Sequence, residues 1–410
     1  MRELEVTIYV DTSLGTFRMI SVGDNPIASS YCFLLADIGT NTVVNNQSVL
    51  TAFQRRGVAG GFAVTTADGC SPTCGNTTGF AAAVATASAA DVIVLTVGLY
   101  PGGGGHIPDG GPTQEDEGFD RSSLVLPGNQ SQLIEAIIAT GKPVVLLLIH
   151  GGALALDTAA HGVPAIVDAH YPGQMGGDAV AAILFGDASP SGRLTTTVYP
   201  ATWATQRAMS DYNLAPHKSA IGDDVPGVTY LYYDGPTDWP FGYGLSYTTF
   251  NFSWASGGDR TVSPRAFVAD GLTPFAVNVT NTGHVVSDVS ALAFVTSGVP
   301  GEPLQRLFDF QRATALAPGA SVTLYFTLPP SLAATVTRHG TRELRAGTRL
   351  EISIGDVARA RGSPRPSSVV RAQVLLEGAS DRVKSPGHGA DGHAAADDVV
   401  VQYALPPRQT

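Results

Sequence analysis

A buried strand that ends in a glycine- and proline-rich loop is the feature that most constrains this chain. Residues 91–98 read DVIVLTVG, a continuous apolar and β-branched run of the length that strands favour. Residues 99–112 read LYPGGGGHIPDGGP, which excludes regular structure because proline lacks an N–H donor and glycine adds freedom in φ. Open α/β sheets place ligand sites at the carboxyl ends of their strands. We therefore expect the chemistry of this protein in that loop.

Acidic side chains follow the loop directly. Residues 115–121 read EDEGFDR, which places four carboxylates and one guanidinium in seven positions. A carboxyl group in a loop that closes over a pocket can have a raised pKa, so Glu115 and Glu117 are candidates for a general acid. A solvated acidic loop explains the same composition without any chemistry. We expect Asp120 and Arg121 to lock the loop as an ion pair or to begin the next helix.

Strands and helices alternate on both sides of this loop. In chain order, the pattern predicts strands at 19–23 and 62–66, a helix at 79–90, a strand at 92–98, a helix at 129–139, strands at 142–149 and 164–169, and a helix at 175–185. Repeated strand, crossover and strand imply a parallel sheet that is covered on both faces. Residues 1–198 are therefore predicted to form an α/β domain, a three-layer α/β sandwich with a mostly parallel sheet.

The pattern changes after residue 186, where helical periodicity nearly disappears. Residues 199–262 are rich in aromatic residues and proline, and we interpret them as a linker that lies against a domain, because a bare patch of large rings is costly. Residues 263–358 carry short alternating strands with turns between them, the pattern of an antiparallel β-sandwich. Residues 359–410 are rich in Arg, Ser, Pro, Gly, Ala and Asp, which predicts a partly disordered tail.

Composition limits the partners of the chain. The 410 residues carry a formal net charge of -11, which argues against nucleic acid and anionic membrane surfaces because both attract basic patches. No run of about 18 apolar residues is present, so no membrane span is expected. Residues 1–10 carry acids where a signal peptide needs a basic and then an apolar stretch, so no export signal is visible.

Cysteines and glycosylation patterns nevertheless fit the secretory pathway. Cys70 and Cys74 can close a small disulfide loop or remain free thiols in a turn, and Cys32 is left alone in either case. Five tripeptides fit the N-glycosylation acceptor pattern, at Asn46, Asn76, Asn129, Asn251 and Asn278. Such tripeptides also arise by chance in a chain rich in Ser and Thr.

The histidines and glycines do not form a known cofactor motif. No His-x-x-x-His or Cys-x-x-Cys pair has the spacing of a metal site, and no Gly-Lys-Ser/Thr follows the glycine tract, so neither a metal nor a cofactor is expected. The Gly-x-Ser-x-Gly nucleophile motif is absent as well. His150 and Asp168 stand at the ends of the predicted strands 142–149 and 164–169, and His170 directly follows the second of them, so these residues are expected to line the pocket.

Several motifs resemble glycoside hydrolase family 3, and within it the β-D-xylosidases. The Glu-x-Glu pair, Gly-Phe-Asp-Arg and LPGNQ that span 115–130 are similar to the acid/base loop of that family and the helix after it. GKPVVL at 141–146 and YPGQMGG at 171–177 match its next strand ends. PFGYGLSYTTF at 240–250 is the most specific match to the xylosidase branch. The resemblance covers roughly residues 17–356.

The resemblance implies a divided active site. In that family a (β/α)8 barrel carries an aspartate nucleophile, the α/β sandwich lends a glutamate as acid/base, and a fibronectin type III-like domain follows. The retaining mechanism needs two carboxyl groups about 5–5.5 Å apart. Glu115 or Glu117 would be the acid/base, with Glu115 preferred, and Asp120 and Arg121 would organise the loop. No segment before residue 17 encodes a barrel, so no nucleophile is expected in this chain and the isolated chain should be inactive.

The predicted function is the C-terminal part of a retaining exo-glycosidase that releases β-D-xylose from xylo-oligosaccharides or another β-glycoside, with a barrel supplied in cis or in trans. An extracellular location follows from the same resemblance. A non-catalytic carbohydrate-binding or scaffold protein is the first alternative, and β-glucosidase or α-L-arabinofuranosidase specificity is the second.

Overall fold

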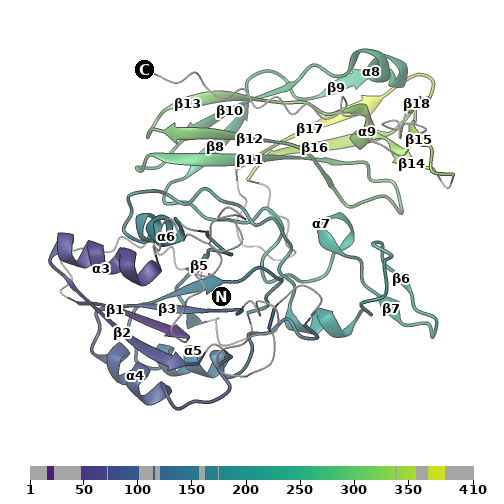
Figure 1. The fold of residues 1–410 in the computed structure, drawn as a ribbon. Helices are drawn as coiled ribbons and strands as arrows, with labels where there is room; N and C mark the ends of the chain where they lie inside the picture. The colour runs from purple at the N-terminus through teal and green to yellow at the C-terminus, as the bar shows by residue number, and fades with distance from the viewer. Residues whose placement is uncertain are drawn as a thin grey trace, which may run out of the picture.

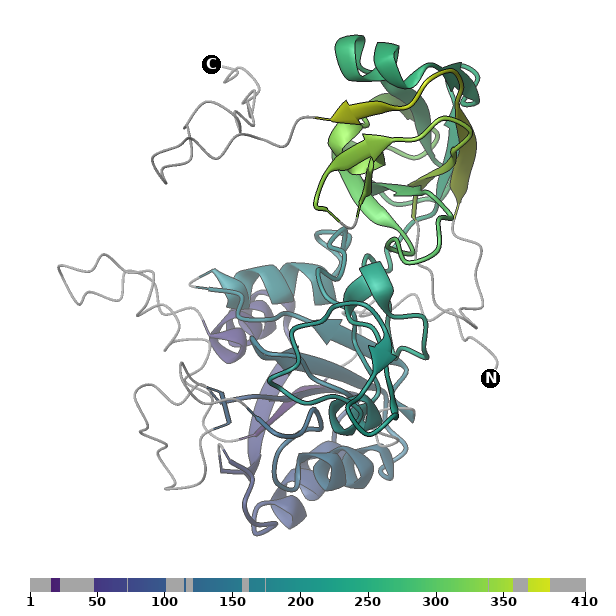
Figure 2. The same cartoon turned by 90° about the vertical axis from the view of Figure 1, so that its right-hand side faces the viewer.

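The computed structural model describes residues 16–22, 48–71, 73–100, 114–115, 121–156, 162–173, 175–337, 339–356 and 368–383. Within these residues the chain forms two layered bodies, a sheet covered by helices and a pair of packed sheets (Figure 1). Figure 2, a view at right angles, shows the same stacking of one body on the other.

The first body is built on a five-stranded sheet in which every neighbouring pair is parallel. The strand order is β2-β1-β3-β4-β5. The bounds are β1 Thr16–Val22, β2 Ala63–Cys70, β3 Val92–Gly98, β4 Val144–Ile149 and β5 Ala165–Asp168. All residues of β4 are buried, and so are all of β3 except the last. Burial on both faces is why these strands are unbroken apolar runs in the sequence.

Helices cover both faces of this sheet (Figure 1). The helices on one face are α3 (Val49–Gly60) and α6 (Gly176–Leu184), and those on the other are α4 (Phe80–Ser88) and α5 (Gln130–Ile138). Successive residues of β3 enter different cores: Val94 packs in the cluster of α3 and α6, and Leu95 in the cluster of α4 and α5. The predicted three-layer α/β sandwich with a parallel sheet is confirmed.

Helix α3 has no counterpart among the predicted elements. Ser48 caps it by accepting a hydrogen bond from the backbone N–H of Thr51 at 3.1 Å. Its buried residues Val49, Phe53 and Gly57 recur every four positions, and the ring of Phe53 lies 5.1 Å from that of Phe185. The apolar stripe is narrow, and Gln54, Arg55 and Arg56 interrupt it after Phe53, so this helix contains no long continuous apolar run.

The second body is a β-sandwich, as predicted. One sheet has the order β13-β10-β8 and the other β12-β11-β16-β17-β9. The bounds are β8 Phe250–Trp254, β9 Arg260–Val262, β10 Phe275–Asn281, β11 Ser287–Thr296, β12 Arg306–Leu316, β13 Ser321–Phe326, β16 Arg349–Gly355 and β17 Val369–Leu376. All pairs are antiparallel except β17 with β9. One continuous core fills the space between the sheets. The fibronectin type III-like assignment remains a prediction.

The sandwich extends beyond the predicted boundaries at 263 and 358. Strands β8 and β9 lie inside the predicted linker, and β17 and the short β18 (Asp381–Val383) lie inside the predicted tail. β17 alternates buried and exposed residues and pairs with β16 along its length, so it is an inner strand of the larger sheet. The apolar run at 369–376 is brief and its surroundings are rich in Arg, Ser and Pro, which is why composition placed it in a weakly ordered tail.

Short elements complete the described part of the chain. They are the 3₁₀ helix η2 (Ala201–Thr205), β6 (His217–Lys218), β7 (Asp224–Val225), α7 (Thr229–Tyr232), α8 (Pro264–Asp270), α9 (Pro330–Ala333), β14 (Thr335–Val336) and β15 (Arg342–Leu344). Across the described ranges, no helix combines the length and apolar character needed to cross a membrane.

Aromatic residues of the 199–262 segment lie between the two bodies. Tyr230 stacks on Phe241 with ring centroids 4.2 Å apart, and both rings meet Phe294 of β11 edge to face. The hydroxyl of Tyr247 donates to the carbonyl of Ile183 in α6 at 2.8 Å. This segment therefore bridges the α/β domain and the sandwich through partly buried rings.

Candidate active site

The carboxyl ends of β3, β4 and β5 lie side by side and form the base of the candidate site. Gly98 ends β3 with φ +150°, and a Cβ at this position would lie 1.8 Å from the carbonyl oxygen of Ile149 in β4. Only glycine permits this close approach. The buried side chain of Gln130 holds the strand end, because it accepts from the N–H of Gly98 at 2.9 Å and donates to its carbonyl at 2.8 Å.

Glu115 lies over the end of β4. The chain returns to this place through Gln114, whose side chain is buried and accepts a hydrogen bond from the N–H of Tyr100 at 2.8 Å. The N–H of Gly151 donates to Oε2 of Glu115 at 3.3 Å. A Cβ on Gly151 would lie 2.3 Å from Oε1 of Glu115 and 2.4 Å from the ring of Tyr171. Glu115 and Tyr171 thus each lie directly against Gly151.

Arg121 ties the chain after the acidic loop to the loop that follows β4. Its guanidinium donates to the carbonyl of Val125 at 3.3 Å and to that of Ala153. Burial lowers the pKa of Arg121, and the nearby Glu115 carboxylate opposes that effect. This is the geometry of a residue that organises a loop. Glu117 and Asp120 lie outside the described residues.

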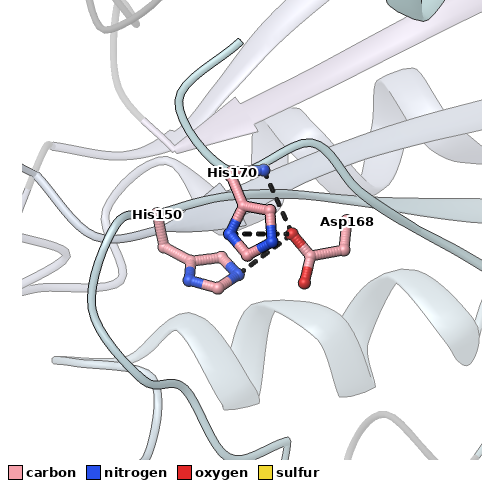
Figure 3. A group of neighbouring side chains, drawn as sticks. All are labelled: His150, Asp168 and His170. Carbon is pink, nitrogen blue, oxygen red and sulfur yellow. Dashed lines mark hydrogen bonds and ion pairs between the residues drawn. The ribbon is translucent and has the colours of Figure 1, made fainter. Parts of the chain in front are cut away.

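His150, Asp168 and His170 converge at the ends of β4 and β5 (Figure 3). His150 Nε2 lies 3.2 Å from Asp168 Oδ1, and His170 Nδ1 lies 3.7 Å from the same oxygen. The backbone N–H of His170 donates to Oδ1 of Asp168 at 3.0 Å, and Nδ1 of His150 lies 2.8 Å from the carbonyl oxygen of Gly152. His150 is only 6% exposed, whereas the side chain of His170 is 43% exposed.

The charges of this group are coupled. Burial lowers the pKa of His150, but the Asp168 carboxylate, the Gly152 carbonyl and the charge of Glu115 outweigh burial, so the pKa of His150 is raised. Burial raises the pKa of Asp168, but the interactions with His150 and His170 outweigh it, so that pKa is lowered. The carboxylate of Glu115 accepts from the N–H of Gly151, the residue after His150, so Glu115 and the histidine group lie next to each other at the end of β4.

Sequence spacing could not bring this group together. His150 and Asp168 are 18 positions apart, and they meet because β4 and β5 are parallel neighbours in a register that pairs Leu148 with Asp168. Motifs of the His-x-x-x-His type find ligands on one helix or in one loop, not on adjacent strands. Tyr171 and Gly151, which contact Glu115, were also missed; both follow predicted strand ends, and that position is the signal that could have found them.

Residues 34–247, just over half of the chain, match the Glycosyl hydrolase family 3 C-terminal domain. This chain belongs to family 3. The matched residues include strands β2 to β5 of the parallel sheet, Glu115 and the histidine group. The resemblance inferred from the motifs is confirmed, and the chain is a glycoside hydrolase C-terminal domain.

Curated relatives in family 3 carry xylosidase names. The exo-1,4-beta-xylosidase bxlB of Emericella nidulans is 36% identical over 291 residues, which cover 67% of this chain and 36% of the relative. The probable exo-1,4-beta-xylosidase xlnD of Aspergillus terreus is 36% identical over 297 residues, 68% of this chain and 35% of the relative. The chain thus spans little more than a third of the length of these relatives.

Solved structures agree at the level of the fold. The GH3 exo-beta-xylosidase XlnD in complex with a xylobiose aziridine activity based probe has a TM-score of 0.76 and 29% identity, over 94% of this chain and 48% of that one. The GH3 beta-glucosidase of Bifidobacterium adolescentis has a TM-score of 0.68 and 24% identity, over 90% of this chain and 50% of that one. This second likeness shows the shared fold alone.

The family 3 domain contains a disulfide between Cys70 and Cys74 at the end of β2. The carbonyl of Cys74 accepts from the backbone N–H of Asn129 at 2.9 Å and from its side-chain amide at 2.8 Å. Asn129 occupies the N-cap position of α5, and the next residue, Gln130, is hydrogen-bonded to Gly98. Asn129 and Gln130 therefore connect the disulfide turn to the end of β3, at the base of the site.

The predicted glycosylation residues lie in different surroundings. Asn76 and Asn251 are exposed, whereas Asn129 and Asn278 are partly buried and hydrogen-bonded through their side chains. Asn46 lies outside the described residues.

Proposed function

We propose that this chain is the C-terminal part of a retaining exo-β-xylosidase and that Glu115 is its general acid/base. The observation that carries the proposal is the position of Glu115, which lies at the carboxyl end of a buried parallel strand and accepts a hydrogen bond from the N–H of Gly151 there. The xylosidase names of the relatives supply the proposed substrate class, β-D-xylose at the end of a xylo-oligosaccharide.

The geometry gives Glu115 a fixed orientation. The Gly151 N–H is directed at Oε2, so Oε1 is the oxygen left to exchange a proton. In the first step of a retaining reaction the protonated acid/base gives its proton to the glycosidic oxygen as the sugar bonds to the nucleophile. In the second step the same carboxylate removes a proton from water, which attacks the glycosyl-enzyme intermediate. Arg121 and His150 set the charge around this carboxylate.

The nucleophile is proposed to come from a barrel domain joined to this chain in cis or in trans. A single carboxylate protonates a leaving group but forms no covalent intermediate, so the isolated 410-residue chain should hydrolyse little or no aryl β-xyloside. Measurable turnover by the isolated chain that is lost in Glu115→Gln would contradict this.

The assignment is tested in an enzyme completed with a family 3 barrel. Glu115→Gln should remove nearly all turnover of an aryl β-xyloside, while Glu117→Gln should retain most of it. Glu135→Gln is the matched control, because Glu135 is exposed on α5, away from the strand ends. Loss in Glu117→Gln with retention in Glu115→Gln would transfer the role to Glu117. Equal turnover of β-glucoside or α-L-arabinofuranoside would overturn the proposed substrate.

An extracellular, glycosylated form is part of the same proposal. Disulfides persist in oxidising compartments, and Cys70 and Cys74 are joined. The exposed Asn76 and Asn251 are the residues proposed to carry glycans. Peptide-N-glycosidase treatment of the secreted protein should lower its mass, and a protein without glycan at either residue would refute this.

A further inference from the structure

The histidine group at the ends of β4 and β5 has the chemistry of a metal site. His150 Nε2, Asp168 Oδ1 and His170 Nδ1 all lie within 4.8 Å of one another. The two measured separations from Oδ1 are 3.2 Å and 3.7 Å. Tetrahedral zinc with bonds of about 2.0–2.2 Å places its ligand atoms roughly 3.3–3.5 Å apart. The two separations from Oδ1 are therefore close to those that such an ion requires.

The hydrogen bond of His150 fixes which ring nitrogen is available. A carbonyl oxygen can only accept, so the contact of 2.8 Å with Gly152 makes Nδ1 the donor. In the neutral ring the lone pair is then on Nε2. Nε2 is buried, makes no hydrogen bond within the described residues, and faces the Asp168 oxygen. Metal-ligating histidines have this arrangement, with the second ring nitrogen donating to a backbone carbonyl.

In the neutral ring, the lone pair of Nε2 and the oxygen of Asp168 face each other. Two acceptors at 3.2 Å repel each other unless a cation lies between them. That cation is either a proton on Nε2 or a metal ion. His170 favours the metal, because its Nδ1 lies 3.7 Å from the same oxygen and adds a third potential ligand (Figure 3).

The backbone of His170 supports a functional role for this third residue. His170 has φ +48°, a left-handed conformation that non-glycine residues rarely adopt. Such strained positions gather at ligand sites. The conformation lets one residue give both its backbone N–H and its ring to Asp168 Oδ1.

We propose that His150, Asp168 and His170 bind one divalent transition-metal ion, with zinc as the expected ion. Two imidazoles and one carboxylate form a donor set suited to zinc, and three protein ligands leave a fourth position for water. The ion would join the ends of β4 and β5 beside Glu115. The retaining mechanism needs no metal, so the acid/base proposal does not require this ion.

The test is zinc binding by the full chain after chelator treatment and dialysis. Isothermal calorimetry should show one zinc ion per chain with micromolar or tighter affinity, and zinc should raise the midpoint of thermal unfolding. Cobalt should bind in its place and give visible d–d absorption bands. None of these readouts involves a substrate, so failure here leaves the acid/base proposal intact.

Variants separate this site from adventitious binding. His170→Asn keeps a residue type that tolerates the left-handed conformation, and it should weaken zinc binding at least about tenfold. Asp168→Asn should do the same, with circular dichroism to check folding.

His217→Ala is the matched control. Its Nε2 lies 3.2 Å from Asp211 Oδ2 and its Nδ1 lies 3.1 Å from a backbone carbonyl oxygen, as for His150 in the proposed site. His217 and Asp211 differ from the proposed site because no third potential ligand joins them within the described residues. The His217→Ala variant should bind zinc as tightly as the parent chain. An absence of saturable binding, or equal binding by His170→Asn and the parent chain, would show that the group is a histidine-carboxylate ion pair without a metal.

Discussion

The backbone N–H of Gly151 donates to Oε2 of Glu115 across 3.3 Å, and this contact joins the acidic segment to the end of β4. The proposed proton donor is thus positioned by a buried strand, although it comes from a segment 36 residues earlier in the chain. A rigid strand end gives a carboxylate a defined place, which proton transfer requires.

Replacement of Gly151 should displace Glu115. In Gly151→Ala the new methyl carbon would lie 2.3 Å from Oε1 of Glu115 and 2.4 Å from Tyr171, so the carboxylate must move. We expect a loss of about 10- to 100-fold in kcat/KM for an aryl β-xyloside in the barrel-completed enzyme. Gly152→Ala is the control, because its Cβ would lie 3.5 Å or more from Glu115, an ordinary contact. Equal activity in the two variants would exclude a precise role for this contact.

Gln130 should be important for stability. Gln130→Met keeps the length of the side chain but leaves the N–H and carbonyl of Gly98 without their partners in a buried place. We expect the free energy of unfolding to fall by roughly 2–4 kcal/mol, measured by urea denaturation. Gln132→Met, on the exposed side of the same helix, should change it by less than about 0.5 kcal/mol. A similar small effect at Gln130 would show that water replaces its hydrogen bonds.

Asp288 should stabilise the sandwich at neutral pH and lose this effect in acid. Its pKa is lowered mainly by the backbone N–H of Ala315, which donates to Oδ1 at 2.7 Å; slight burial opposes this, and Arg312 reinforces it. A lowered pKa in the folded state means that the carboxylate stabilises the fold above pH 3.8, the ordinary value, and that this stabilisation is lost as the pH falls through the folded pKa.

The Asp288→Asn variant tests that sign. At pH 7 it should be less stable by about 1 kcal/mol, a small figure because solvent screens the Arg312 ion pair. The difference from the parent chain should shrink as the pH falls below 3.8. Asp270→Asn, exposed at the end of α8, controls for the loss of one negative charge. A difference that stays constant over the acid range would refute the assignment.

The sequence was most informative where burial dictates residue type. β3 and β4 are buried on both faces, so apolar composition alone located them within two residues of their ends. α3 and β17 were harder because each buries only one side and its exposed side chains interrupt the apolar pattern. Strand order could not be read from the chain either: β1 lies between β2 and β3, and only the packed structure shows this insertion.

The candidate site was predictable in part. The loop after β3 and the place of Glu115 follow from rules about strand ends. The contact of Glu115 with Gly151 and the convergence of His150 with His170 do not, because both depend on how adjacent strands align. Local spacing rules contain no information about register between strands that are far apart in sequence.

The claim that Glu115 is the proton donor is tested most directly by how the activity of Glu115→Gln depends on the leaving group of the substrate. In the barrel-completed enzyme, the variant should lose most of its activity on an aryl β-xyloside with a poor leaving group and much less on one whose leaving group needs no proton. Azide should restore turnover and yield β-xylosyl azide, because this anion attacks the glycosyl-enzyme intermediate without needing a base to deprotonate it. Equal losses on both substrates, with no effect of azide, would contradict the assignment of Glu115 as the proton donor.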